Sequence, residues 1–333
     1  MKKALISGIS GQDGSYLAEL LLEKDYEVHG LLRRSSTGNL KNVKHLDIEI
    51  HIGDLTDSTS INRIIREIMP DEVYNLGAFT HVGQSFKNSE YVMQVNGLGC
   101  LYLLEAIKNA KKERKYIKYY QASPSELFGN AEETPQSENT RFNPVSPYGI
   151  SKQVAYYYTK IYREAYNLFA CNGILFNHES PRRSDDFVSK KIIKAVINIS
   201  KGKQDKLYLG NLDARRDWGY AKDYVEAIWL ILQQDQADDF VIATNETHTV
   251  REFVELAFKE VGINIDWDGQ GLYETGYDIN TGKILIGVKE EFYRPLDVNI
   301  LQGNYAKAEQ VLKWQPKVKF NELIKLMIED ELK

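Results

Sequence analysis

Short apolar runs alternate with amphipathic segments along the first half of the chain. The apolar runs predict strands at residues 3–7, 27–33, 48–53, 72–76, 115–122 and 169–176. Segments with helical periodicity fall between them, at residues 15–24, 58–69, 91–109 and 148–166. Because repeated strand–helix–strand units are typical of a doubly wound parallel sheet, we expect an α/β fold of the Rossmann-like class.

The pattern becomes less regular after Asn177. Loops are expected at residues 181–186 and 210–218, and residues 267–287 have the composition of short strands and turns. We expect much of the last third to form a smaller α/β cap over the carboxyl ends of the strands, where such folds bind ligands. The expected division assigns residues 1–176 and about 211–244 to a cofactor domain, and about 177–210 and 245–333 to a substrate domain.

Charge and cysteine content narrow the range of functions. The formal net charge of −5 argues against a general nucleic-acid binder and against binding to anionic membranes. We find no signal peptide and no run of about 18 apolar residues, so we expect a cytoplasmic protein. Cys100 and Cys171 are too few for a disulfide framework and lack metal-ligand spacing. We expect both to be buried small residues in a reducing compartment, and we expect no metal site.

A glycine motif lies between the first predicted strand and the first predicted helix, at Gly8, Gly11 and Gly14. Glycines there permit a tight turn and a close approach of the backbone to a pyrophosphate at the helix N-terminus. The second strand ends in Arg33-Arg34-Ser35-Ser36, where an NAD enzyme would place a carboxylate on the ribose. Guanidinium groups bind phosphate, so these residues favour NADP, with a solvated basic loop as the alternative. Asp54-Leu55 could cap the adenine, or Asp54 could simply start a helix.

Two further motifs have catalytic chemistry. Lys152 follows Tyr148 by one helical turn, so their side chains share a face. A nearby ammonium lowers the pKa of tyrosine from its usual value of about 10, which would make Tyr148 a base for oxidation of an alcohol. Glu126 lies at the end of the fifth predicted strand and is a candidate acid or base. The alternative is that Ser123, Ser125 and Glu126 form the N-cap of a short helix.

Polar and basic residues continue after the sixth strand, beginning with Asn177-His178-Glu179-Ser180-Pro181-Arg182-Arg183. Lys190-Lys191, Arg215-Arg216 and Arg294 follow later in the chain. Individually such residues are usually solvated surface charges. Together they suit a local site for a diphosphate in a chain of net negative charge.

These motifs together resemble the GDP-mannose 4,6-dehydratase family of extended short-chain dehydrogenases/reductases. The glycine loop and the Tyr148/Lys152 pair occur throughout the superfamily, whereas residues 177–183 and 216–225 are far more specific to the family. The resemblance runs nearly end to end. The matching segments are residues 8–17, 33–36, 120–123, 146–148 with Lys152, 176–183, 216–225 and 292–295.

The resemblance implies an internal redox elimination on GDP-mannose or a close GDP-sugar. Tyr148, its pKa lowered by Lys152, would take the proton of the sugar 4-hydroxyl while NADP+ accepts the C4 hydride. The 4-ketone would acidify the C5 proton, which Glu126 would remove before protonating the departing 6-hydroxyl. Hydride would then return to C6, giving a 4-keto-6-deoxy sugar.

The resemblance also implies binding residues and a homodimer or homotetramer, with the loop at residues 33–36 near a neighbouring subunit. The catalytic candidates are Tyr148, Lys152, Glu126 and Ser125. Besides Tyr148 and Lys152, the implied cofactor contacts are Gly8, Gly11, Gln12, Asp13, Gly14, Arg33, Arg34, Ser35, Ser36, Asp54, Leu55, Leu76, Gly77, Ala78, Thr80, Tyr91, His178 and Arg183. The implied substrate contacts are Ser85, Asn177, Glu179, Lys191, Arg216 and Arg294.

Several positions depart from the family pattern. The family threonine that hydrogen-bonds the sugar 4-hydroxyl is Pro124 here, which has no side-chain donor. Losing one such bond costs about 1–3 kcal/mol, or roughly 5- to 150-fold in rate, unless Ser123 or Ser125 compensates. Phe79-Thr80 replaces the usual Gln-Ser, and Phe128 replaces a tyrosine. These changes suggest an altered sugar pocket.

The departures leave four alternatives to GDP-mannose dehydration. They are the same dehydration of a GDP-manno-heptose, a 4-dehydrogenase or epimerase of the same fold, a decarboxylase of a UDP-uronate, and a regulator that binds NADP without catalysis. Glu126 favours dehydration, because epimerisation at C4 needs no base at C5. The GDP-family segments disfavour the decarboxylase, and the Tyr148/Lys152 pair disfavours the regulator.

Overall fold

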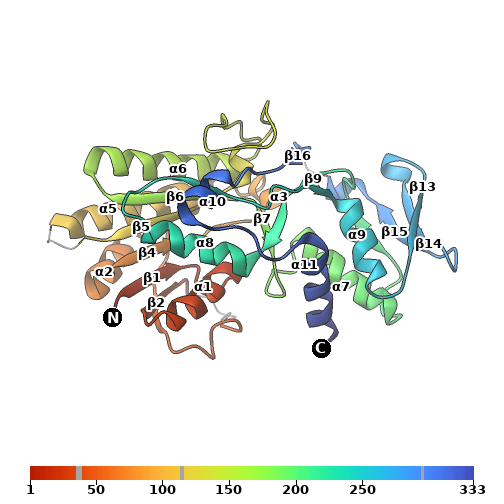
Figure 1. The fold of residues 1–333 in the computed structure, drawn as a ribbon, viewed down its shortest axis with the longest axis horizontal. Helices are drawn as coiled ribbons and strands as arrows, with labels where there is room; N and C mark the ends of the chain where they lie inside the picture. The colour runs from red at the N-terminus through yellow and green to blue at the C-terminus, as the bar shows by residue number, and fades with distance from the viewer. Residues whose placement is uncertain (35–39, 113–115, 294–295) are drawn as a thin grey trace.

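The computed structural model describes residues 1–34, 40–112, 116–293 and 296–333. Figure 1 shows an elongated molecule, in which a larger part is built on one sheet and a smaller part, here called the cap, contains α7, α9, α11 and β13–β15. The predicted doubly wound α/β fold with a smaller cap is confirmed. Within the described residues, no helix combines the length and apolarity needed to cross a bilayer.

Within the part of the chain that the structure describes, seven parallel strands form the large sheet in the order β11-β6-β5-β4-β1-β2-β3. The inner strands are covered on both faces, which explains why they appear in the sequence as apolar runs. The strands are β1 Lys3–Ser7, β2 Glu27–Leu32, β3 Glu49–Ile52, β4 Glu72–Asn75, β5 Lys118–Pro124, β6 Phe169–Leu175 and β11 Phe240–Ile242.

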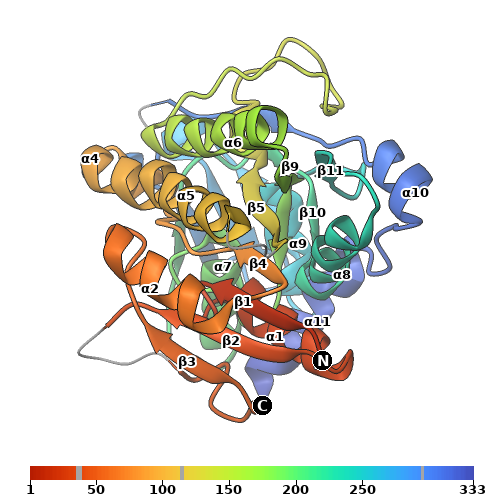
Figure 2. The ribbon, with the colours of Figure 1, turned by 90° about the vertical axis from the view of Figure 1, so that its left-hand side faces the viewer.

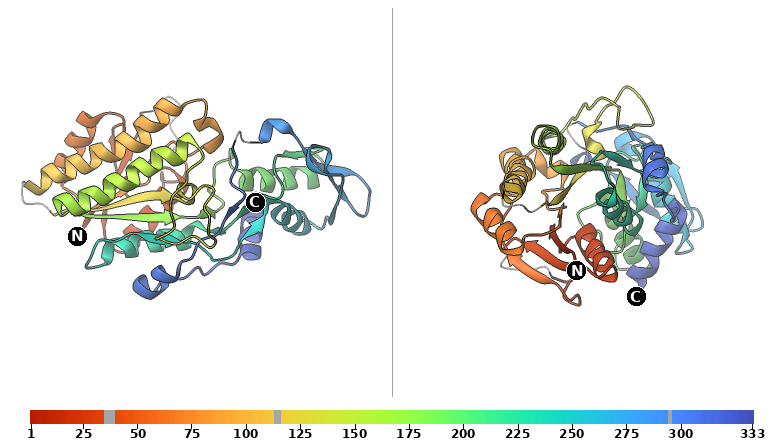
Figure 3. Two further views of the ribbon diagram at one scale, coloured as in Figure 1. Left: turned by 90° about the horizontal axis from the view of Figure 1, so that it is seen from above. Right: turned by 60° about the vertical axis from the view of Figure 1, so that its left-hand side comes forward.

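Helices cover both faces of this sheet, with α1 and α8 on one side and α2, α5 and α6 on the other (Figure 2). Each helix turns an apolar stripe to the sheet; α1, for example, buries Leu17, Ala18 and Leu21. The long helices α5 and α6 lie side by side (Figure 3). These helices are α1 Gln12–Glu23, α2 Ser58–Ile68, α5 Gly99–Lys112, α6 Pro147–Tyr166 and α8 Ala221–Gln233.

The cap has its own apolar core, formed where α7, α9 and α11 pack against the sheet β13-β14-β15-β8. Two small sheets, β10-β7 and β12-β9-β16, lie between the cap and the large sheet. The cap helices are α7 Val188–Ser200, α9 Val250–Lys259 and α11 Phe320–Leu332. The strands are β7 Asn177–Glu179, β8 Leu207–Leu209, β9 Arg215–Arg216, β10 Trp218–Tyr220, β12 His248–Thr249, β13 Ile265–Asp268, β14 Thr275–Asp278, β15 Ile284–Val288 and β16 Ile300–Leu301.

One late helix, α10 (Ala306–Leu312), returns to the large sheet. Its Ala308 and Leu312, with the following Trp314, belong to the apolar core beneath α1 and α8. The expected domain division remains a proposal. This packing leads us to count α10 with the cofactor domain rather than with the substrate domain.

Several element boundaries differ from the prediction. Helix α1 begins at Gln12, three residues early, because Gly11 takes the N-cap position. The helix expected at residues 91–109 consists of α4 Ser89–Val92, a π-helical segment Met93–Leu98 and α5. Strand β5 begins at Lys118 and continues to Pro124, and residue 115 lies outside the described residues. The strand-rich composition of residues 267–287 is confirmed by β13, β14 and β15.

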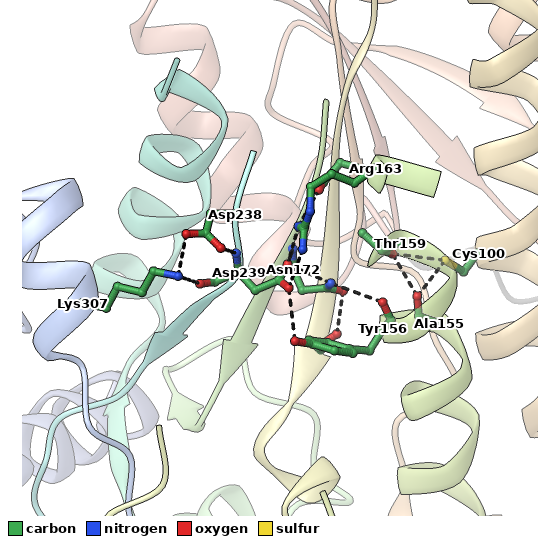
Figure 4. A network of polar contacts seen from close by, with 11 residues as sticks. Cys100, Ala155, Tyr156, Thr159, Arg163, Asn172, Asp238, Asp239 and Lys307 are labelled. Carbon is green, nitrogen blue, oxygen red and sulfur yellow. Dashed lines mark hydrogen bonds and ion pairs between the residues drawn. The ribbon is translucent and has the colours of Figure 1, made fainter. Parts of the chain in front are cut away.

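A buried network anchors α6 to the sheet (Figure 4). Asp239, just before β11, accepts hydrogen bonds from both terminal nitrogens of Arg163, at 2.7 and 2.8 Å, and from the Tyr156 hydroxyl at 3.1 Å. It also accepts bonds from the backbone and side-chain nitrogens of Asn172 on β6, at 2.9 and 3.0 Å. Arg163 and Tyr156 belong to α6, so one carboxylate fixes the helix against two strands. As predicted, Cys100 and Cys171 are both buried.

Candidate active site

A cavity of about 970 Å³ lies between the carboxyl ends of the large-sheet strands and the cap. On the sheet side, its wall contains Leu76 after β4, residues 122–126 at the end of β5, and Leu175-Phe176 at the end of β6. On the other side, the wall includes Lys191 on α7 and Arg216 on β9. Ligands of doubly wound sheets bind at this edge, and the cavity is large enough for a nucleotide ligand.

Tyr148 is presented to the cavity by the first turn of α6. Ser146 caps this helix by accepting a hydrogen bond from the Gly149 amide at 3.0 Å, and Pro147 has the fixed backbone angle that suits a first turn. Gly149 is needed for close packing, since a Cβ there would lie 3.0 Å from the Glu126 carbonyl oxygen. Tyr148 and Glu126 therefore line the same cavity, as predicted for an acid/base pair.

The protonation of the tyrosine differs from the prediction. Burial raises the pKa of Tyr148, and the negative charge of Glu126 raises it further. Lys152 instead donates to the Ala122 carbonyl oxygen at 2.9 Å, and burial lowers its own pKa to about 8. The expectation that Lys152 lowers the pKa of Tyr148 is therefore wrong for this structure. Burial is the largest cause of the pKa shift of each group, and it acts against the charged form of both.

Asn96 is a buried residue behind the cavity wall that the sequence did not reveal. Its side chain accepts from the Phe79 amide at 2.9 Å and donates to the Phe79 carbonyl at 3.1 Å and to the Ser151 hydroxyl at 3.0 Å. Ser151 in turn donates to the Tyr148 carbonyl at 2.7 Å. Asn96 therefore ties the loop after β4 to α6. It lies in the π-helical segment, a rare conformation frequent at functional sites.

The glycine loop is packed too tightly for side chains. Gly8 has a φ of +71°, and a Cβ there would lie 2.8 Å from the backbone of Gly77. A Cβ on Gly14 would lie 2.3 Å from the Gly8 carbonyl oxygen. The N-cap residue of α1 is Gly11, which has no side chain that could cap the amides of the first turn. These features fit the predicted pyrophosphate-binding turn.

A partly buried ion pair joins this loop to β7. His178 Nε2 lies 2.9 Å from an Asp13 carboxylate oxygen, and His178 Nδ1 lies 2.7 Å from the Phe176 carbonyl oxygen. Burial alone would lower the pKa of His178, but the Asp13 carboxylate outweighs it and raises the pKa. The pKa of Asp13 is lowered because His178 outweighs its burial. The Gln12 side-chain amide donates to the His178 carbonyl oxygen and accepts a hydrogen bond from the Ser180 hydroxyl. Gln12, a predicted cofactor contact, therefore holds the glycine loop to the segment that contains β7.

In the predicted cation pairs Lys190-Lys191 and Arg215-Arg216, one residue lines the cavity and the other bonds to residues away from it. Lys191 lines the cavity beside the Phe292 ring, whereas Lys190 pairs with Glu331 at 2.7 Å. Arg216 lines the cavity and donates to Val298 and Asp297, whereas Arg215 donates to the Thr247 carbonyl. Adjacent residues of a strand point to opposite faces, which explains the second division.

Other predicted contacts fall in and beside the cavity. Ser125, Ala78, Thr80 and Asn177 line it, as do Glu179 and Arg183, which form an ion pair at 3.0 Å. Ser85 is buried, and its hydroxyl bonds to the backbone of Val82 and Tyr148.

Other predicted cofactor and substrate contacts do not line the cavity or are not described. Arg33, on the surface, donates to the Tyr91 hydroxyl. Asp54 bonds to Thr56, and Leu55 packs in the apolar core. Ser35, Ser36 and Arg294 lie outside the described residues.

The positions that depart from the family pattern differ in their access to the cavity. Pro124 and Thr80 line it. The Phe79 ring packs edge-on against Tyr91, and Phe128 is buried against Phe176. The N-cap alternative for the serines is wrong, because the short 3-10 helix Ser125–Leu127 begins after Pro124 without a side-chain cap.

The cavity also contains charged residues that sequence analysis did not single out. They include Lys87, Asp185 and Asp297, and the cavity wall also contains His81, which caps α3 (Val82–Ser85). No motif marked Asp297 as a partner of Arg216, because 81 residues separate them. Their pairing depends on the chain returning to the cavity through β16.

Comparison with known proteins decides the family. The family model described as GDP-mannose 4,6 dehydratase matches residues 5–327. The chain belongs to the GDP-mannose 4,6-dehydratase family. It is 52% identical to the GDP-mannose 4,6 dehydratase of Dictyostelium discoideum, over 99% of this chain and 96% of that protein. It is 53% identical to the protein of the same name from Homo sapiens, over 98% and 90% of the two chains.

A solved structure shares the fold at lower identity. The UDP-glucose 4-epimerase of Thermotoga maritima, solved with UDP-glucose, superposes with a TM-score of 0.82 at 23% identity and covers 98% of both chains. The family assignment and this likeness agree on a Rossmann-like sheet with a cap.

Proposed function

We propose that this protein is an NADP-dependent hydro-lyase that converts GDP-mannose, or a close GDP-sugar, to its 4-keto-6-deoxy derivative. The main support is that Tyr148, Lys152 and Glu126 line one cavity in a member of this family. Full-length relatives about half identical to the chain have the name GDP-mannose 4,6-dehydratase.

The glycine loop and the residues around it fit a nicotinamide dinucleotide. The closely packed Gly8, Gly14 and Gly77 leave backbone amides at the start of α1 for a pyrophosphate. Arg33 and Arg34 at the end of β2 have the charge for a 2′-phosphate, so we propose NADP rather than NAD. When bound, the nicotinamide supplies the acceptor and then the donor of a hydride.

Tyr148 and Lys152 handle the proton of the sugar 4-hydroxyl in this proposal. The raised pKa of Tyr148 means that its phenolate, once formed, is a strong base. Lys152 lies one turn away with a pKa of about 8, so it can hold or release a proton near neutral pH. We propose that it passes protons to and from Tyr148, aligned by its bond to the Ala122 carbonyl.

Glu126 supplies the second acid/base function. It removes the C5 proton next to the 4-ketone and returns a proton to the 6-hydroxyl, which leaves as water. Hydride then returns to C6, and the proton taken from the 4-hydroxyl is delivered to C5. The sugar is oxidised at C4 and reduced at C6, so the reaction consumes no net oxidant.

Binding of the GDP-sugar is assigned to the cap side of the cavity. Lys191 and Arg216 face it as cations for the diphosphate, with Asn177 nearby and Glu179 held by Arg183. As the family resemblance implies, we also propose a homodimer or homotetramer, which analytical ultracentrifugation would test.

A GDP-manno-heptose is the second candidate substrate, because two of the departures from the family pattern, Pro124 and Thr80, line the cavity. The test is mass spectrometry of GDP-mannose and GDP-manno-heptose incubated separately with the purified protein. Loss of one water from either sugar supports the dehydratase and identifies the preferred substrate. Loss of two hydrogens with stoichiometric NADPH would refute dehydration and establish a 4-dehydrogenase.

A further inference from the structure

Two histidines and a glutamate meet at the outer edge of the large sheet, on neighbouring parallel strands. His29 on β2 stands opposite Glu49 on β3, and Leu31 stands opposite His51. Positions two apart in a strand share a face, so the side chains of His29, Glu49 and His51 gather on one side of the sheet. None of the three lines the active-site cavity.

The spacing of their ligand atoms matches a tetrahedral metal site. His29 Nδ1 lies 3.0 Å from His51 Nε2 and 3.5 Å from a Glu49 carboxylate oxygen. The other Glu49 oxygen lies 3.6 Å from His51 Nε2. A tetrahedral Zn²⁺ with ligands at about 2.0–2.1 Å holds those ligands about 3.3–3.4 Å apart. Small side-chain adjustments would therefore bring all three groups onto one ion.

A second carboxylate orients the buried histidine. Glu27 Oε1 lies 3.0 Å from His29 Nε2 and 3.0 Å from the Lys3 ammonium. A carboxylate paired with the Lys3 ammonium only accepts hydrogen bonds, so the proton shared with His29 is on Nε2. With a proton on Nε2, the His29 ring can present the lone pair of Nδ1 to a cation between His51 and Glu49. Metal-bound histidines typically donate their other N–H to such a carboxylate.

The charges around His51 also suit a cation. The His51 side chain is only 12% exposed, and its Nε2 faces the Glu49 carboxylate. Glu67 places a second negative charge near His51. Arg63, the neighbouring cation, is paired with that Glu67 at 2.8 Å. Glu49 is exposed, and β3 is the last strand of the sheet (Figure 2), so an ion can reach the site from solvent.

We propose that His29, Glu49 and His51 bind one Zn²⁺ ion, with water as the fourth ligand. Two imidazoles and one carboxylate favour zinc over magnesium or calcium, which prefer all-oxygen sites. The ion fastens the edge strand β3 to β2 and has a structural role. We expected no metal site because the two cysteines lack metal-ligand spacing. That expectation did not consider His29 and His51, which are 22 residues apart in the sequence and meet only when β2 pairs with β3.

Zinc titration of the full-length, tag-free protein tests the proposal. After removal of metal with EDTA, binding is followed by competition with a chromophoric chelator, and metal content is measured by inductively coupled plasma mass spectrometry. We expect one Zn²⁺ per chain and a higher melting temperature with zinc. His51→Ala should weaken binding by more than about 10-fold, and Glu27→Gln by about 10- to 100-fold.

Two further variants keep the result interpretable. Glu49→Gln retains the side-chain size at an exposed position, and it should also weaken binding even if His51→Ala does not fold. His45→Ala is the matched control, since His45 pairs with Glu19 outside the cluster, and it should bind zinc like the wild type. The proposal is overturned if no zinc binds at one per chain, or if Glu49→Gln and His51→Ala bind it as tightly as the wild type. The two histidines would then simply share a hydrogen bond.

Discussion

Replacing Asp239 with asparagine tests how firmly the helix that holds Tyr148 and Lys152 is anchored. The carboxylate accepts five hydrogen bonds, from Arg163, Asn172 and Tyr156 (Figure 4). An asparagine retains the oxygen facing Asn172 but presents an NH₂ group to Arg163 Nη2. The variant therefore leaves a largely buried guanidinium without its counter-charge.

The size of the effect follows from that buried ion pair. Removing one partner of such a pair typically costs about 3–5 kcal/mol. The unfolding entropy of about 2.1 cal/mol/K per residue gives about 0.7 kcal/mol/K for a chain of 333 residues. The expected fall in melting temperature is therefore about 4–7 °C.

Differential scanning fluorimetry of the wild type and Asp239→Asn at neutral pH measures this shift. Asp238→Asn is the matched control, because Asp238 pairs with Lys307 near the surface and should cost no more than about 1 kcal/mol. Although burial alone would raise the pKa of Asp239, Arg163 and Asn172 lower it below its usual value of 3.8. The stabilisation is thus complete above pH 3.8 and is lost as pH falls through the lowered pKa.

A melting temperature within about 1 °C of the wild type would refute this reasoning, since it would mean that Arg163 is adequately solvated without Asp239. The double variant Arg163→Met/Asp239→Asn provides an independent check. It should be less destabilised than the sum of the two single variants, because it leaves no unpaired charge. Strict additivity would contradict the ion-pair explanation.

Four further substitutions test the proposed chemistry. Tyr148→Phe should abolish steady-state turnover with little change in melting temperature; measurable turnover would remove the residue from its role. Glu126→Gln should permit C4 oxidation, seen as NADPH absorbance, while mass spectrometry detects no water loss; a dehydrated product at the normal rate would exclude Glu126. Pro124→Thr should speed GDP-mannose turnover by up to about 5- to 150-fold, and an unchanged or lower rate would mean that the pocket has adapted to proline. Gly14→Ala should reduce the NADP content of the purified protein and its melting temperature, because the new Cβ would lie 2.3 Å from the Gly8 carbonyl oxygen; normal NADP content would argue against the glycine cradle.

Features set by local chemistry were predictable from the sequence. Strand β1 has the predicted bounds, and α2 begins at the predicted Ser58, because buried parallel strands and amphipathic helices have distinct apolar patterns. The glycine turn was predictable for a similar reason, since Gly8 adopts a positive φ that other residues rarely adopt. Glu126 could be placed at the ligand-binding edge because it follows the carboxyl end of β5.

Features set by tertiary packing were not predictable. The pKa of Tyr148 depends on its burial and on Glu126, neither of which its spacing from Lys152 reveals. Asn96 has a role only because a π-helical segment turns it toward Phe79 and Ser151. Arg215 and Arg216 have the same charge, and only the pairing of β9 with β12 and β16 determines which one faces the cavity.

The path of the chain between its two parts has a consequence for engineering. After β6 the chain enters the cap, and it returns through β10 to α8 on the large sheet. It leaves again after β11, and returns once more to α10 before ending in the cap helix α11. Neither part is a contiguous segment, so a single proteolytic cut or gene truncation releases neither as an intact unit. Transplanting the sugar specificity of a relative would therefore require grafting several separate segments at once.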